Sequence, residues 1–169
     1  MRIYLPSTVS GLRVAASAAE VPVRSGVAFA VTDSLRAEYP GWSQDELEYL
    51  AMLDASRASL RLLAASDPEE PALRVVIAAD VDDVLATPRP EADRAVVAVP
   101  IGPVPWHRVA SVHLDGADAA PAVRAAAQVI DAADLGDDDA EFTLGSAEDF
   151  DLAWYAPGEI RYLLDELAG

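Results

Sequence analysis

Two aspartates at the end of one apolar run have the residue type and spacing of a reaction centre. The stretch RVVIAADVDDVLATP, residues 74–88, predicts a buried strand that ends in Asp-x-Asp, at Asp80 and Asp82. An Asp at the carboxyl end of a central strand can attack phosphorus as a nucleophile, and a second acid two residues on can protonate the leaving group. The pattern therefore raises the hypothesis of a magnesium-dependent phosphoryl hydrolase.

The same stretch resembles the first motif of the haloacid dehalogenase-like phosphatases, and LGDDDAE, residues 135–141, resembles their Gly-Asp metal motif. The resemblance implies that Asp80 is the nucleophile and that Asp82 is the acid. It also implies that Asp80, Asp137 and Asp138 hold Mg²⁺.

The spacing and the charge balance count against this hypothesis. Only 56 residues separate Asp80 from Asp137, too few for the strands and helices that such a fold inserts. The chemistry also needs a cation, usually Lys, to offset the nucleophile and the phosphate, and the chain has no Lys. The sequence favours the alternative, in which Asp80, Asp82 and Asp83 end a strand and lie in a solvated turn. It thus predicts no cofactor, with Mg²⁺ as the alternative.

The absence of two residue types excludes several further chemistries. All 12 basic residues are Arg, and there is no Cys. Without Cys there is no disulfide, thiolate nucleophile or Cys-based zinc site, and without Lys there is no Schiff base or P-loop lysine. His107 and His113 are the two histidines, and neither lies in a metal-binding motif. No Ser lies in a nucleophile elbow, so we expect structural roles for both histidines.

The chain is strongly acidic, which narrows the classes of partner. It has 29 acids against 12 bases and a formal net charge of -17. Such a charge repels nucleic acid and anionic membranes and attracts basic protein surfaces. Residues 134–151 hold eight acids and no base and lack the EF-hand pattern, so they are predicted to form a solvated loop. We expect a protein partner, no nucleic acid and no membrane. An alternative is that this protein is an acidic mimic, which occupies a basic surface of another protein.

The remaining composition predicts location and fold class. No apolar run approaches the 18 or so residues that cross a bilayer, and the amino terminus has no cleavage signal, so we expect a cytoplasmic protein. Residues 1–169 are expected to form a single compact α/β (or α+β) domain, with a mixed β-sheet of five to six strands and helices packed on it. The expected strands are residues 1–6, 27–32, 73–80, 94–100, 109–114 and 150–155, and the expected helices are residues 8–20, 33–39, 43–66, 118–134 and 157 to the C-terminus.

Local signals fix the ends of two of these helices. Ser43 and Glu46 match the S-x-x-E capping box, which predicts that the longest helix begins there. Asp118 is the expected N-cap of the helix over residues 118–134, and Gly136 is suited to end it.

Four side chains are the candidate contacts for a partner. Arg57 and Arg61 lie one helical turn apart, and this spacing predicts that their guanidinium groups bind an anion or carboxylate. The alternative is ion pairing with acids such as Asp54. Trp154 and Tyr155 are neighbours on an expected strand, so one ring should enter the core while the other is exposed to a partner. The sequence therefore favours a binding or interaction module without catalytic activity.

Six segments carry a resemblance that covers nearly the whole chain. They are MRIYLPST, VAFAVT, ELEYLAMLDASRASLRLL, RVVIAADV, DAADLGDDDAEF and LAWYAPGEI. They look like a family of uncharacterised actinobacterial proteins of about this length, for which no activity is established. The resemblance implies a bacterial cytoplasmic origin and a single domain. The absence of Lys and Asn, typical of a GC-rich genome, agrees with it.

Overall fold

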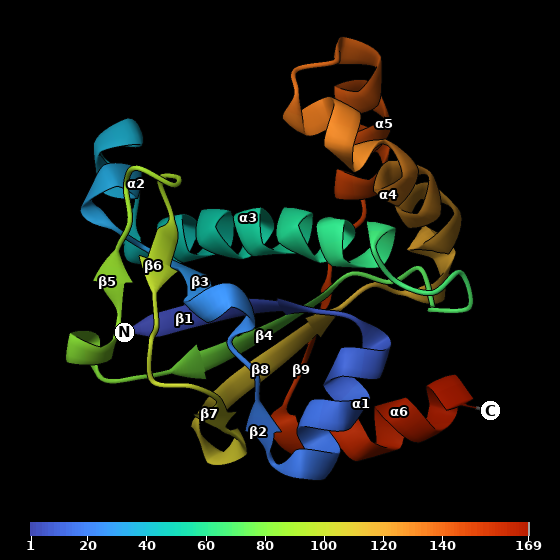
Figure 1. The fold of residues 1–169 in the computed structure, drawn as a ribbon, viewed down its shortest axis with the longest axis horizontal. Coiled ribbons are helices and arrows are strands. Elements are labelled where there is room, and N and C mark those ends of the chain that lie inside the picture. Colours follow the sequence, from blue (N-terminus) through green and yellow to red (C-terminus); the bar gives the residue numbers. More distant parts are fainter. Residues whose placement is uncertain (169) are drawn as a thin grey trace.

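The fold is a seven-stranded antiparallel sheet with helices on both faces, accompanied by a two-stranded ribbon (Figure 1). It is given by a computed structural model, which describes residues 1–168. The strands of the large sheet, in spatial order, are β5 (Thr87–Pro88), β6 (Val96–Ala98), β3 (Val27–Ala30), β1 (Arg2–Ser7), β4 (Val75–Asp80), β8 (Val109–Leu114) and β9 (Ala153–Tyr155). The ribbon pairs β2 (Glu20–Val21) with β7 (Val104–Pro105).

Six α-helices lie among the described residues, and short 3₁₀ turns connect several elements. The helices are α1 (Val9–Ala18), α2 (Asp33–Glu38), α3 (Gln44–Ala64), α4 (Ala120–Asp134), α5 (Asp138–Glu148) and α6 (Ile160–Ala168). The 3₁₀ turns are Arg24–Gly26, Asp83–Leu85, Trp106–Arg108, Ala117–Ala119 and Pro157–Glu159.

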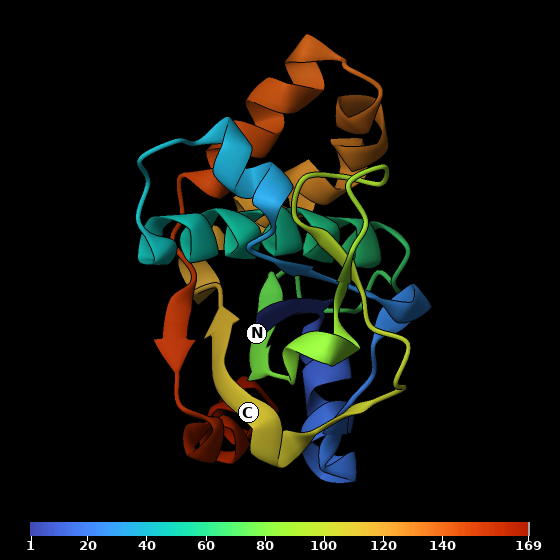
Figure 2. The same ribbon diagram turned by 90° about the vertical axis from the view of Figure 1, so that its left-hand side faces the viewer.

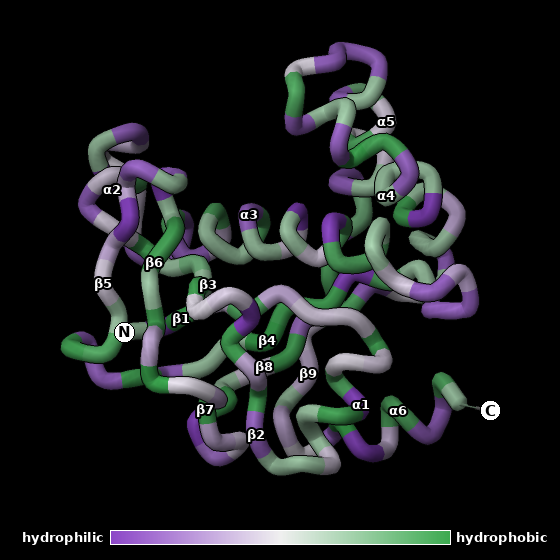
Figure 3. The backbone as a smooth tube through the Cα atoms, viewed as in Figure 1, coloured by the Kyte–Doolittle hydropathy of each residue, from purple (hydrophilic) through white to green (hydrophobic). Residues whose placement is uncertain are grey.

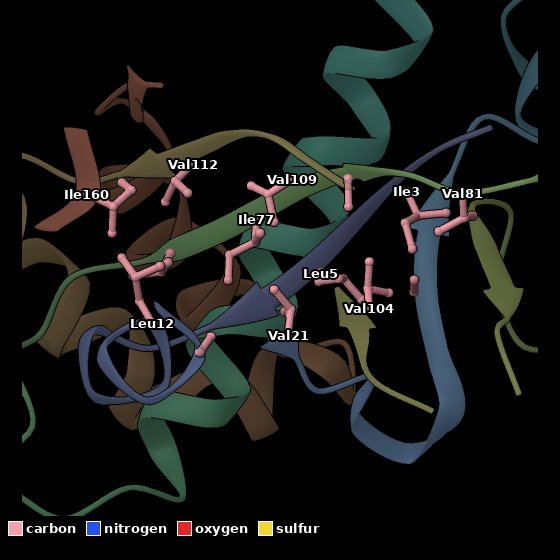
Figure 4. Packing of buried hydrophobic residues seen from close by; sticks show 14 of the residues in the cluster. Ile3, Leu5, Leu12, Val21, Ile77, Val81, Val104, Val109, Val112 and Ile160 are labelled. Atoms are coloured by element: carbon pink, nitrogen blue, oxygen red, sulfur yellow. The ribbon is translucent and has the colours of Figure 1, made fainter. Parts of the chain in front are cut away.

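One face of the sheet is covered by α1 and α6. Alternate residues of β1, such as Ile3 and Leu5, point to this face and pack with Leu12 of α1 and Ile160 of α6 (Figure 4). The central strand β4 is buried on both faces, so it carries nearly continuous apolar sequence, which Figure 3 shows as green along β4.

Helix α3 covers the opposite face. Its residues Leu47, Ala51 and Met52 pack against Tyr4 and Val76 of the sheet. The capping box predicted at its start is present, because Ser43 accepts from the backbone of Glu46 and the Glu46 side chain accepts from the backbone of Ser43.

The helical hairpin of α4 and α5 packs on the C-terminal part of α3 and projects beyond the sheet (Figure 1). Its buried residues are Ala or medium-sized: Val123, Ala126 and Ile130 from α4 meet Ala140 and Leu144 from α5. Small side chains let these two helices approach closely.

The predicted fold class, an α/β arrangement with helices packed on a sheet, is confirmed. Two details differ from the expectation. All strand pairs among residues 1–168 are antiparallel, whereas mixed directions were expected, and the large sheet has seven strands because β5 adds an edge strand to the six that were expected. Strands β2, β5 and β7 have two residues each, which is too short to produce a detectable period in the sequence.

The prediction of a solvated loop over residues 134–151 is wrong for most of its length. Residues 138–148 form α5, whose N-cap is Asp137: its side chain accepts from the backbone of Ala140 at 2.8 Å. Gly136, with φ of +93°, ends the preceding helix as predicted. Asp118 is not the N-cap of α4, because a 3₁₀ turn over residues 117–119 precedes that helix.

None of the helices within residues 1–168 combines the length and the apolar character needed to cross a bilayer.

Candidate functional site

An open cleft of about 440 Å³ lies on the α3 side of the sheet, toward the β9 edge. Helix α3 packs on β1, β3 and β4, and the sheet continues past it through β8 and β9. The residues that line the cleft come from β1, β4, β8, β9 and α3, and they are Arg2, Tyr4, Asp45, Glu48, Tyr49, Met52, Ala78, Ser111, His113 and Trp154. Aromatic, acidic and hydrogen-bonding groups thus meet in one cleft.

The pairing register of the strands determines which side chains form the floor of the cleft. Tyr4 of β1 pairs with Ala78 of β4, which pairs with Ser111 of β8. In the neighbouring row His113 of β8 pairs with Trp154 of β9. Paired residues of antiparallel strands project to the same face, so all of these side chains point toward the α3 side.

Helix α3 supplies one wall of the cleft. Asp45, Glu48, Tyr49 and Met52 have i, i+3, i+4 and i+7 spacing and therefore form one stripe along the helix. The Tyr49 hydroxyl donates to Asp151, just before β9, at 3.4 Å. This contact spans from the helix to the segment that leads into the edge strand.

Ser111 and His113 form a hydrogen-bonded pair inside the cleft. The Ser111 Oγ lies 3.0 Å from the His113 Nε2, because residues two apart on a strand project to the same face. Burial lowers the pKa of His113 below its ordinary value, and the charge of Arg2 lowers it further. A neutral imidazole can donate or accept, and among residues 1–168 the His113 Nδ1 has no hydrogen-bond partner, so it can bind a polar ligand group.

The charges around the cleft are mostly negative. Arg2 forms a bidentate ion pair with Asp80, both bonds at 3.0 Å, and this hydrogen bonding lowers the pKa of Asp80. Burial raises the pKa of the Tyr4 hydroxyl, and the nearby Glu48 raises it further. The hydroxyl of Tyr4 therefore stays protonated and can donate to a ligand.

The aspartates of the phosphoryl hydrolase hypothesis are held in separate places. Asp80 pairs with Arg2 at the end of β4, and Asp82 precedes a 3₁₀ turn. Asp137 caps α5, and Asp138 begins that helix on the far side of α3 (Figure 1). Within the part of the chain that is described, no group of three His, Asp or Glu side chains could hold a metal ion. These residues do not fit the Mg²⁺ site that the hypothesis requires.

Arg57 and Arg61 point to the α4–α5 hairpin, away from the cleft. The Arg61 Nε lies 2.6 Å from Asp134, and the Arg57 Nη2 lies 2.7 Å from Glu141 and 3.3 Å from Asp134. Ion pairing was the predicted alternative, but its partner is different, because Asp54 pairs with Arg94 at 3.0 Å. The two guanidinium groups join α3 to the hairpin, and an anion would have to compete with these acids.

Trp154 and Tyr155 lie as the strand geometry predicts. The Trp154 side chain is 60% exposed and borders the cleft, while Tyr155 packs against the core on the α1 and α6 side. The sequence therefore identified one residue of the cleft but missed its neighbours. The S-x-H spacing of Ser111 and His113 on a strand, and the stripe of Asp45, Glu48 and Tyr49 on a helix, are the signals that could have found them.

A family model described as a family of unknown function (DUF6912) matches residues 1–164. Comparison with curated proteins and with solved structures found no match.

Proposed function

Since the chain belongs to this family of unknown function, we propose its function from its geometry: it is an interaction module that binds a partner protein at the cleft and at the adjoining edge of β9. The observation that carries this proposal is the position of Trp154. It is a large aromatic side chain, 60% exposed, on the last strand of the sheet and beside an open cleft. Exposed aromatic residues next to a pocket are frequent centres of binding energy.

The free edge of β9 supports the same site. Figure 2 shows β9, in red, at the outer edge of the sheet. Among residues 1–168, β9 has no hydrogen-bonded strand on the side away from β8. A free edge can accept an extended segment of another protein as an added strand, with backbone hydrogen bonds for affinity and side-chain pockets for specificity.

The charge of the chain supports a protein partner rather than nucleic acid or a membrane. A formal charge of -17 opposes approach to phosphate-rich surfaces. The absence of Lys and Asn is typical of a GC-rich genome, so the proposed location is the cytoplasm of a bacterium with such a genome, for example an actinobacterium. In this proposal binding, without catalysis, is the function.

The test is quantitative affinity capture of proteins from cells that produce this chain, with three baits. Wild type should retain a partner that Trp154→Ala loses, and Phe142→Ala should retain it. Phe142 is a matched control, because it is 81% exposed but lies on α5, away from the cleft. A captured protein is then purified, and its affinity for each variant is measured by calorimetry. Equal affinity for wild type and Trp154→Ala would contradict the proposal.

A further inference from the structure

We propose that the cleft binds an organic cation, the ammonium group of a lysine side chain on the partner. This inference rests on the proposed function and names the chemistry of its recognition. Three features carry it: two carboxylates without a cation, two aromatic walls, and the geometry of a strand added to β9.

The first feature is the state of Asp45 and Glu48. Asp54, Asp80 and Asp134 are each paired with arginine. Within residues 1–168, in contrast, neither Asp45 nor Glu48 forms an ion pair, although both line the cleft. Glu48 accepts a hydrogen bond from Gln44 at 3.1 Å, but among the described residues neither carboxylate has a cation within ion-pair distance, so the two, one helical turn apart, attract a cation into the cleft.

The positive groups of the cleft do not cancel this charge. Arg2 forms a bidentate pair with Asp80, so these two residues together carry no net charge, although Arg2 still acts on His113 and interacts with Glu48. Burial of His113 keeps its imidazole neutral at neutral pH. The field of the two carboxylates reaches the floor of the cleft, where Glu48 and Asp45 both act on the Tyr4 hydroxyl. An anionic ligand would therefore be repelled, and a cationic one attracted.

The second feature is the aromatic character of the walls. Tyr49 from α3 and Trp154 from β9 both line the cleft, and they are 48% and 60% exposed. The negative faces of such rings attract an ammonium group, and tryptophan does so most strongly. The rings also suit the apolar methylene chain of a lysine, which prefers to lie along apolar surface.

The third feature places the lysine on the partner. A strand added to β9 would present, opposite Trp154, a side chain on the same face of the sheet as Trp154. That face is the floor of the cleft, as the row of His113 and Trp154 shows. A lysine at this one position of the added strand would lie beside Trp154 on the cleft side of the sheet, whereas its two neighbours in sequence point to the other face.

The experiment uses the full chain and two extended heptapeptides of Thr and Val, one with a central Lys and one with a central norleucine. Binding is followed at fixed ionic strength by the NMR signal of the Trp154 indole N–H. We expect the Lys peptide to bind and the norleucine peptide to bind at least about fivefold more weakly. Equal binding of the two peptides would overturn the proposal.

Three variants assign the effect to the cleft. Asp45→Asn and Glu48→Gln should each weaken binding of the Lys peptide by about two- to fivefold. Glu166→Gln is the matched control, because it removes the same charge from an exposed position on α6 and should leave the affinity unchanged. If the control loses as much affinity as the cleft variants, the attraction is that of the whole protein and the proposal fails.

A third ligand, cadaverine, separates a free amine from a peptide side chain. If cadaverine binds as tightly as the Lys peptide, the lysine of a partner is not the ligand and this inference is overturned. The failure of the inference is distinct from that of the proposed function. Suppose that a captured partner loses affinity for Trp154→Ala and binds Asp45→Asn and Glu48→Gln as tightly as wild type. That result would agree with the proposed function and contradict only the recognition of a lysine.

Discussion

Arg74 and Asp115 form a bidentate ion pair in the interior, and their side chains are 1% and 0% exposed. The Arg74 Nε and Nη2 each lie 2.8 Å from a carboxylate oxygen of Asp115, which also accepts from the backbone N–H of Arg74. The same guanidinium donates to the carbonyl oxygen of Phe150 at 2.8 Å. The pair thus joins the start of β4, the end of β8 and the segment that leads into β9, and so it helps to place Trp154.

We predict that Asp115→Asn lowers the free energy of unfolding by about 3–5 kcal/mol, because it leaves the Arg74 charge buried without a counter-charge. The double variant Arg74→Met with Asp115→Leu should lose less, since it removes both charges together. Urea unfolding followed by circular dichroism measures both. A loss below about 1 kcal/mol in Asp115→Asn would show that the pair is less important than its burial indicates.

Features that depend on neighbours in the sequence could be predicted, and features that depend on strand order could not. The capping box of Ser43 and Glu46 is local and was found at the right residues. Helix α5 was missed, because its buried face is made of Ala140, Leu144 and Ala147, a weak apolar signal among many acids. The pairing of Asp54 with Arg94 joins residues 40 apart in sequence, and no local pattern indicates it.

The candidate site follows the same division. Trp154 was identified because adjacent residues of a strand face opposite sides, which is a local rule. The cleft itself needs β1, β4, β8 and β9 to be neighbours, an order that the sequence does not state. It also needs α3 to leave the β9 side of the sheet open, which depends on how the helix packs.

Ser59 offers a test of how α3 is held on the sheet. Its buried hydroxyl donates to the carbonyl oxygen of Ser7 at 2.7 Å and accepts from the backbone N–H of Val75 at 3.1 Å. Ser59→Ala leaves both backbone groups unpaired and should cost about 1–3 kcal/mol of unfolding free energy in urea titration. Ser56→Ala is the control, because within residues 1–168 the Ser56 hydroxyl bonds only to Leu53 in its own helix. Equal losses in the two variants would refute this role.

Asp134 should contribute modestly to stability and in a salt-dependent way. It lies between Arg57 and Arg61 in a partly exposed position, so Asp134→Asn should cost up to about 1 kcal/mol at low salt and less in 1 M NaCl. Hydrogen bonding to Arg61 lowers the pKa of Asp134, so its contribution is present above the ordinary value of 3.8 and is lost as pH falls below it. Asp131→Asn, an exposed acid on the same helix, is the control. A loss that persists in 1 M NaCl would contradict the electrostatic explanation.

Asp137 should behave as a helix cap and not as a metal ligand. Asp137→Ala should lower the unfolding free energy by about 0.5–2 kcal/mol, because the backbone N–H of Ala140 loses its acceptor. At fixed ionic strength, Mg²⁺ should shift the thermal midpoints of wild type, Asp80→Asn and Asp137→Ala by equal amounts. A midpoint that rises with micromolar Mg²⁺ in wild type alone would revive the phosphoryl hydrolase hypothesis.

His113 should make the protein less stable in mild acid. Burial lowers its pKa in the folded protein below the ordinary value of 6.5, so below that pH the unfolded chain takes up a proton that the folded protein does not. Stability from this residue is therefore unaffected above pH 6.5 and falls as the pH is lowered toward 5. The upper limit at pH 5 is about 2 kcal/mol, and partial access to solvent reduces it.

The measurement is the unfolding free energy of wild type, His113→Gln and His107→Gln at pH 7.5, 6 and 5. His113→Gln keeps a polar group beside Ser111 and should lose less stability than wild type between pH 7.5 and 5. The charged neighbours of His113 in the cleft are Arg2, Asp45 and Glu48, and they are the same in wild type and in both variants. His107 is exposed and serves as the control. If the unfolding free energies of wild type and His113→Gln change equally with pH, the folded protein protonates the imidazole as readily as the unfolded chain does. The cleft would then be more hydrated than the burial of His113 indicates.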